Sequence, residues 1–144
     1  MSEGSMDDAD REAVERFVSV SERRLSREAE RSLWLNRAVV TELESDADRV
    51  LGIARRNLER MRGREGWGRN PWLVRWRIVL DSGVDAVIEV LLSRDPEAVE
   101  LRQNTPFAGV LPQEDRERLL AGFGRYWTRV NKRSSESTEA SVEA

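Results

Sequence analysis

The stretch NPWLVRWRIVLDSGVDAVIEVLL, residues 70–92, decides the fold class. Asn70 followed by Pro71 is typical of a helix start, since the asparagine side chain caps the first turn and the N–H that proline lacks is not needed there. The turn at residues 81–83 separates this helix from a second one, residues 84–91, which is almost entirely apolar. The stretch therefore predicts two consecutive helices, the second of them at the centre of a core.

Two amphipathic helices are predicted before this stretch. Ser26 caps the first, and acidic residues in its first turn suit the helix dipole. The second begins at Ser45 or Asp46 and stops at Gly63. The apolar stripe of the first consists of Ala29, Leu33, Val40 and Leu43, with Asn36 as a polar interruption, and that of the second of Ala47, Val50, Ala54, Leu58 and Met61.

Two further helices are predicted after it. Asp95 and Pro96 begin a short helix that runs to about Arg102, and the last helix begins near Gln113. The polar residues after Asn131 predict a disordered tail. The whole chain thus predicts an all-α, compact single-domain bundle of about five to seven helices, with a partly helical acidic segment at 1–25, the helical domain at 26–131 and the tail at 132–144.

The segment between these last two helices, residues 103–113, carries no charge and contains Pro106 and Pro112. Two explanations fit. The loop can plug the end of the bundle, with Phe107, Val110 and Leu111 buried and Asn104 hydrogen-bonded to loop backbone. Alternatively it is a docking element for a partner protein, with the edge formed by Asn104 and Thr105 facing outward.

Composition argues against catalysis. The 144 residues include no histidine and no cysteine, and Lys132 and Tyr126 are the only residues of their kinds. This leaves few ways to build a general base, a thiolate nucleophile or a zinc site. We therefore expect a non-enzymatic protein without cofactor or metal. The acidic first ten residues lack the apolar core of a secretory signal and no apolar run is long enough for a membrane span, so we expect a cytoplasmic location.

Charge is distributed unevenly along the chain. Residues 49–77 contain nine arginines against Glu59 and Glu65, whereas both flanking regions are acidic. Basic and aromatic side chains alternate in this segment and could bind nucleic acid through phosphate contacts and stacking; they are Arg55, Arg56, Arg60, Arg62, Arg64 and Arg69, with Trp67 and Trp72. The same arginines could equally form a solvated face or pair with the acidic ends of the chain. Trp34 lies one position off the first apolar stripe, which suits an exposed interface anchor.

Three segments carry a resemblance to a known family: LRQNTPFAGVLPQEDR (101–116), RSLWLNRAVVTEL (31–43) and PWLVRW (71–76). Together they resemble the C-terminal partner-binding domain of antitoxin-like, Xre-associated regulators of toxin–antitoxin systems in high-GC bacteria. The region before Arg31 is too short and too acidic for the repressor-type DNA-binding domain that precedes such domains.

The resemblance implies a protein that binds and neutralises a cognate toxin encoded next to it, by direct protein–protein contact. The alternative is a small nucleic-acid-binding transcriptional regulator that uses residues 49–77 to contact DNA. The candidate partner-binding residues are Trp34, Arg55, Arg56, Arg60, Trp67, Asn104 and Thr105.

Overall fold

The computed structural model describes residues 25–66 and 68–143, with the backbone alone beyond residue 133. These residues form helices and no strand, so the all-α prediction is confirmed. The acidic segment predicted at 1–25 lies outside the described residues up to position 24, and so does the candidate residue Trp67. The helices are α2 (Arg27–Ser45), α3 (Ala47–Glu65), α4 (Pro71–Asp81), α5 (Val84–Leu92), α6 (Pro96–Gln103) and α7 (Gln113–Glu143).

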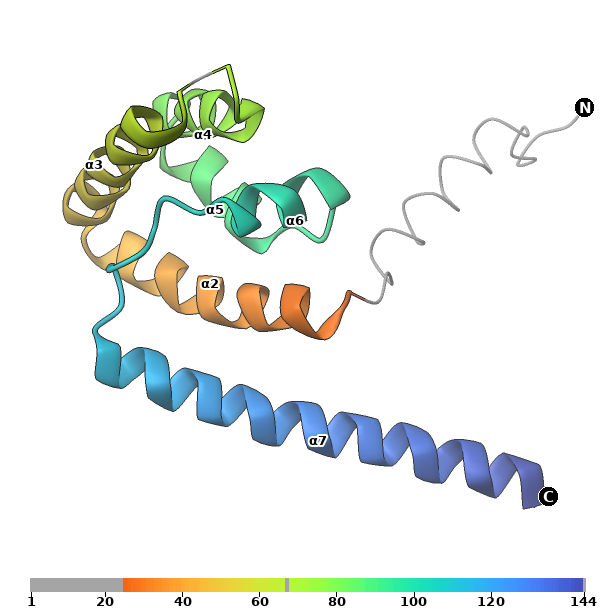
Figure 1. The fold of residues 1–144 in the computed structure, drawn as a ribbon. Coiled ribbons are helices and arrows are strands. Elements are labelled where there is room, and N and C mark those ends of the chain that lie inside the picture. The colour runs from red at the N-terminus through yellow and green to blue at the C-terminus, as the bar shows by residue number, and fades with distance from the viewer. Residues whose placement is uncertain (1–24, 67, 144) are drawn as a thin grey trace, which may run out of the picture.

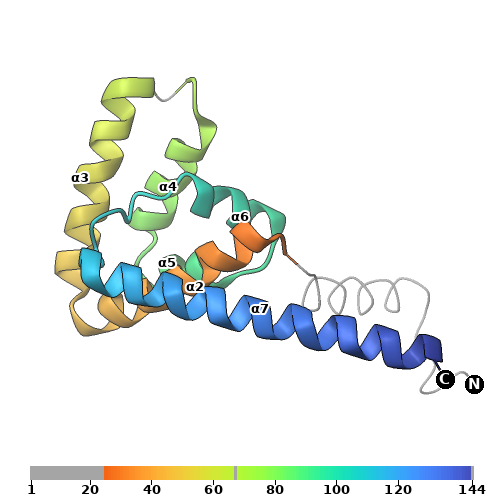
Figure 2. The same cartoon turned by 60° about the horizontal axis from the view of Figure 1, so that its bottom comes forward.

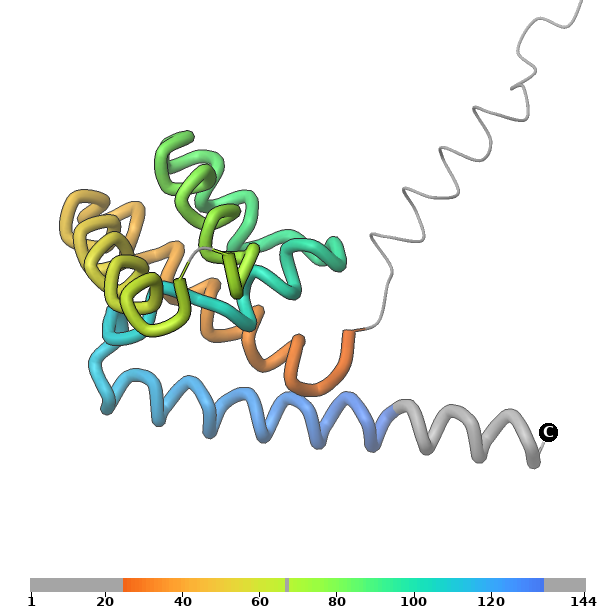
Figure 3. The backbone as a smooth tube through the Cα atoms, turned by 45° about the horizontal axis from the view of Figure 1, so that its top comes forward, coloured from red at the N-terminus to blue at the C-terminus, as the bar shows by residue number. Residues whose placement is uncertain are grey.

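Helix α2 runs through the middle of the molecule and separates α7 from the other helices (Figure 1). It packs against α3, α5 and α6 on one side and against α7 on the other. After a turn of the view, α7 still lies along α2 and continues past its first residue (Figure 2). The chain that joins α6 to α7 crosses the molecule near α3 and α2, which can be followed in the backbone trace (Figure 3).

The helix starts follow the capping residues in the sequence. Ser26 Oγ accepts a hydrogen bond from the Ala29 N–H at 3.2 Å, and Asn70 Oδ1 accepts one from the Trp72 N–H at 3.1 Å. The predicted end of α3 at Gly63 is wrong. The helix continues to Glu65 and is closed by Gly66, whose φ of 73° lies in the left-handed region that glycine adopts without strain.

The core lies between α2, α3, α4 and α5. Val87 and Leu91 of α5 are fully buried, which confirms the central place predicted for this helix. Trp76 of α4 is also fully buried, and its indole N–H donates to the Leu101 carbonyl of α6 at 2.7 Å, so the polar atom of this large side chain is satisfied. Leu73 is fully buried as well.

Helix α7 is attached to the molecule through aromatic side chains. Phe123 is buried, and the Trp34 ring from α2 lies 5.8 Å from it in an edge-on arrangement. The backbone is helical to Glu143, and the disorder expected of the tail at 132–144 stays a prediction. No proline or glycine follows Gly124, so no residue in this stretch forces the helix to stop.

Candidate functional site

The uncharged loop, residues 104–112, closes one end of the core. The Phe107 and Val110 side chains are buried, and the Phe107 ring lies 5.5 Å from that of Trp76 in an edge-on contact. Leu111 packs against the core from its edge. The prediction that this loop plugs the bundle is therefore confirmed.

The outward side of the loop is held in place by hydrogen bonds. The Asn57 amide of α3 donates to the carbonyls of Pro106 at 2.7 Å and Ala108 at 2.8 Å. The Thr105 hydroxyl accepts from the Phe107 N–H at 3.1 Å. Gly109, with φ of 87°, provides a left-handed residue before the chain turns toward α7. The loop is thus fixed from both sides, although the sequence did not single out Asn57.

Asn104 was predicted to bond the loop backbone, and this is wrong in detail. Its amide nitrogen donates to the Glu100 carbonyl of α6 at 3.0 Å, and its amide oxygen accepts from Asn70 at 3.2 Å. Asn104 therefore joins the end of α6 to the cap of α4. Asn57 takes the role that had been expected of Asn104, because its amide faces the loop carbonyls from a neighbouring helix.

A groove lies on each side of the loop. The first, which we call the arginine groove, has a volume of about 530 Å³ and separates the loop from α3. The second, the α2 groove, has a volume of about 310 Å³ and separates the loop from α2 and the start of α7. Thr105 and Ala108 line both grooves, so they form a ridge between them. The arginine groove is lined by Asn57, Arg60, Met61, Arg64, Thr105 and Ala108.

Positive charge borders this ridge on both sides. Arg60 and Arg64 line the arginine groove, and Arg31 and Arg116 line the α2 groove. Within the part of the chain that the structure describes, none of these four arginines has an ion-pair partner. Glu28 is the one carboxylate among the described residues that line the two grooves. The uncharged, rigid ridge is therefore bordered on both sides by arginine side chains that have no ion-pair partner among the described residues.

The structure brings together only part of the predicted site. Arg60 and Thr105 share the arginine groove. Arg56 is exposed on α3 but lines neither groove, and Arg55 is used internally: it pairs with Asp81 at 2.8 Å and donates to the Leu80 carbonyl at the end of α4.

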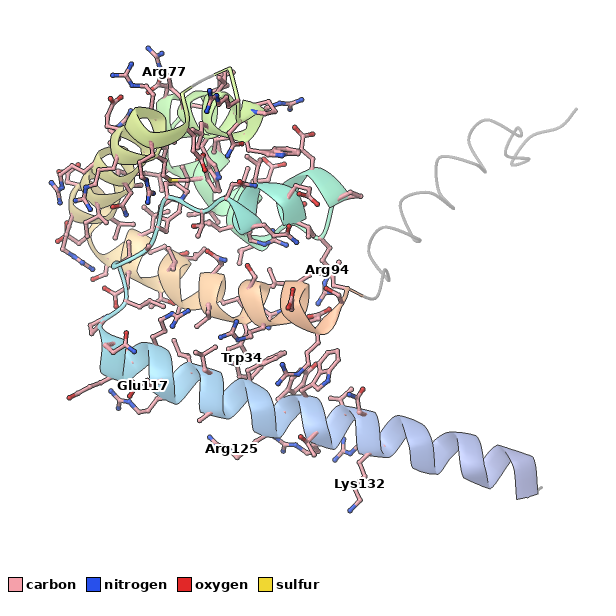
Figure 4. The ribbon with its side chains drawn as sticks, viewed as in Figure 1. Trp34, Arg77, Arg94, Glu117, Arg125 and Lys132 are labelled. Carbon is pink, nitrogen blue, oxygen red and sulfur yellow. The ribbon has the colours of Figure 1, made fainter. Side chains whose placement is uncertain are left out.

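Trp34 is not the free anchor that its sequence position suggested. It is half-buried between α2 and α7, away from the loop (Figure 4). Sequence reasoning did not assign Arg31 or Arg116 to the site, and it considered Arg64 for nucleic-acid binding alone. Arg64 stands in the arginine-rich segment, but nothing in the local sequence of Arg31 or Arg116 places them beside the loop.

One arginine is deeply buried and has a structural explanation. Arg102 is 2% exposed, and its Nη1 donates to the carbonyls of Val90 at 2.8 Å and Ser93 at 2.5 Å, which closes the end of α5. Burial lowers the pKa of this guanidinium, and nearby Arg94 lowers it further, while Glu30 raises it. Glu30 is itself paired with Arg94 at 2.6 Å.

The described residues contain no group of three or more acidic, histidine or cysteine side chains that could hold a metal ion. None of the described helices is both long enough and apolar enough to cross a membrane. Comparison with known proteins finds no matching family model, no similar curated protein and no similar solved structure. Function must therefore be argued from the loop and its two grooves.

Proposed function

We propose that this chain is a non-enzymatic, antitoxin-like protein that binds a cognate toxin by direct contact and neutralises it. The observation that carries the proposal is the ridge of Thr105 and Ala108, with arginines in the grooves on both sides that have no ion-pair partner among the described residues. Arginine is among the residues that contribute most to protein interfaces, because it combines charge, several donors and a long apolar stem.

The rigidity of the loop supports a binding role. Two hydrogen bonds from Asn57 and the buried side chains of Phe107 and Val110 fix the ridge before any partner arrives. Binding to a fixed surface avoids the entropy that is lost when a mobile loop becomes ordered. The ridge is thus a preorganised contact surface rather than a segment that must fold on its partner.

The charges indicate the chemistry of the partner. Surfaces that bind each other usually carry complementary potentials, which speed encounter and select the partner. Arg31, Arg60, Arg64 and Arg116 would meet an acidic surface on the toxin. The resemblance of residues 101–116 to antitoxin-like proteins supports a toxin as that partner, and the lack of histidine and cysteine disfavours catalysis.

Co-expression with the product of the neighbouring gene tests the proposal. The natural chain should restore growth and co-elute with that product in gel filtration. The double variant Arg60→Glu and Arg64→Glu should lose both effects while keeping its melting temperature, because both side chains are exposed and have no ion-pair partner within residues 25–66 and 68–133. A matched control reverses Arg37 and Arg56, which are also exposed but line neither groove. A neighbour that is harmless alone, or toxicity that persists beside an excess of folded protein, would contradict the proposal.

A nucleic-acid-binding regulator remains the second candidate, because one observation favours it. Arg56, Arg60 and Arg64 follow one another at four-residue spacing on the exposed side of α3, and none has an acidic partner among the described residues. Such a row can track phosphates, and its affinity for DNA would fall steeply with salt. Arg56→Glu separates the two functions, since it should weaken DNA binding and flatten its salt dependence but leave toxin binding intact.

A further inference from the structure

A third groove lies on the opposite side of the core from α7 and has a different character. It has a volume of about 460 Å³ and lies between α4, α5 and α6. Its apolar lining comes from Ile78, Val79, Ala86, Val90, Ala98 and Leu101. Ile78 leaves 59% of its surface exposed, the most of any large apolar side chain among the described residues. We call this the acidic groove, because Glu89, Asp95 and Glu97 also line it.

The rim of the acidic groove carries excess negative charge. Glu89 and Asp95 line it, and neither side chain has an ion-pair partner within the described residues. Glu97 also lines it but is paired with Arg75, which joins α6 to α4 across one end. An apolar floor with an acidic rim fits an amphipathic helix whose polar side is basic.

Residues 126–133 of α7 have these properties. Tyr126 and Val130, one turn apart, each leave 38% of their surface exposed. Arg129 and Arg133, one turn apart on the adjoining face, are exposed and have no ion-pair partner among the described residues. No acidic residue occurs between Glu117 and Glu136. Past the start of α2 this helix extends away from the body of the molecule (Figure 2).

The two surfaces cannot meet within one chain. Helix α7 packs on the side of α2 that faces away from α4 and α6 (Figure 1). The arginine groove and the α2 groove are rimmed by arginines, which repel those of α7. The acidic groove of a second copy offers α7 both an apolar floor and unpaired acidic side chains of the described residues.

We propose that this protein forms a reciprocal dimer in which residues 126–133 of each α7 bind the acidic groove of the other copy. Val130 and the exposed part of Tyr126, whose ring also stacks on Trp34 of its own chain, then cover Ile78 and its apolar neighbours, while Arg129 and Arg133 face Glu89 and Asp95. Because each copy gives one helix and receives one, the assembly closes on itself as a two-fold dimer. The contact leaves the ridge at Thr105 and Ala108 uncovered, so the dimer presents two ridges. Dimer formation therefore does not depend on whether a partner binds these ridges.

Charge reversal on the two surfaces distinguishes loss of the dimer contact from a general loss of stability. One variant, Glu89→Lys with Asp95→Lys, makes the groove basic; the other, Arg129→Glu with Arg133→Glu, makes α7 acidic. Each variant alone places like charges together and should associate at least about tenfold more weakly than the natural chain, as measured by sedimentation velocity. When the two are mixed, both contacts of the dimer are matched again, and a heterodimer should form.

The control reverses two exposed acidic residues outside the groove, Glu44→Lys and Glu114→Lys, and should leave the dimer intact. Circular dichroism should give the same helical spectrum for all variants. A natural chain that stays monomeric at high concentration overturns the proposal. So does a dimer that persists in both single-surface variants, since another contact would then hold it, or a mixture of the two that stays monomeric.

Discussion

The indole of Trp34 on α2 stacks on the phenol ring of Tyr126 on α7, with 5.2 Å between ring centroids and 29° between ring planes. Its other close neighbour is Phe123, so the tryptophan lies among α7 aromatic side chains. Trp34, which its sequence position suggested to be an exposed anchor for a partner, thus attaches the last helix of the chain to the rest of the molecule.

Trp34→Ala should therefore loosen α7. We expect a loss of about 2 kcal/mol in the free energy of unfolding, less than for a fully buried tryptophan because the ring is only half-buried. Urea denaturation followed by circular dichroism measures it. Val74→Ala, at an exposed apolar position of α4, is the control and should change stability by less than about 0.5 kcal/mol. Equal effects of the two variants would mean that α7 does not depend on this stacking.

Phe107→Ala should cost about 3 kcal/mol of stability, because it leaves a cavity beside Trp76 where the loop closes the core. Phe107→Leu keeps most of the volume and should cost about 1 kcal/mol. The neighbouring substitution Ala108→Ser, on the exposed ridge, should have almost no effect on the denaturation midpoint. A near-zero change for Phe107→Ala would place this ring outside the core.

Asn57→Ala removes the donors that hold the carbonyls of Pro106 and Ala108. We expect a loss of about 1–2 kcal/mol, because two hydrogen bonds disappear and their acceptors face a partly buried space. The effect should be local: amide hydrogen exchange should speed up at Val110, whose N–H bonds the Phe107 carbonyl, before it does in α5. Uniform acceleration throughout the helices would instead mean that Asn57 supports the whole fold.

Two glycines three residues apart should respond oppositely to alanine. Gly63 lies within α3 with nothing within 4 Å of where its Cβ would be, so Gly63→Ala should stabilise the protein by up to about 1 kcal/mol. Gly66 has φ of 73°, a conformation that alanine adopts only with strain, so Gly66→Ala should destabilise it by about 1 kcal/mol. Thermal melting distinguishes the signs. Stabilisation by both changes would contradict the observed end of α3.

Local sequence signals predicted the fold well because each acts within a few residues. Ser26, Asn70 and Pro71 mark helix starts by capping geometry, and the apolar spacing of 84–91 identified the central helix. The end of α3 was harder to predict, since both Gly63 and Gly66 are possible helix ends in the sequence. The positive φ of Gly66 in the structure shows that the helix ends there. The prediction that Phe107 plugs the core rested on an uncharged, proline-bounded loop, and it was correct.

The candidate site was predicted only in part, because it depends on residues far apart in the chain. Arg31, Arg60 and Arg116 come from three helices, and no local pattern indicates that they surround the same loop. Nothing in the sequence around Asn57 distinguishes it from other polar residues of α3. Its role depends on a contact with the carbonyl of Pro106, 49 residues later in the chain. Arg55 was selected for its charge and Trp34 for its aromatic ring. Both groups are used inside the molecule, where Arg55 pairs with Asp81 and Trp34 stacks on Tyr126.

The contact between α2 and α7 also has a consequence for biosynthesis. The elements that form the core, from α2 to Val110, are synthesised before Phe123 and Tyr126. Without α7 the Trp34 face of α2 has no covering among the described helices, and its indole is open to any apolar surface nearby. A chain truncated after Val110 should therefore bind chaperones that the full-length chain does not.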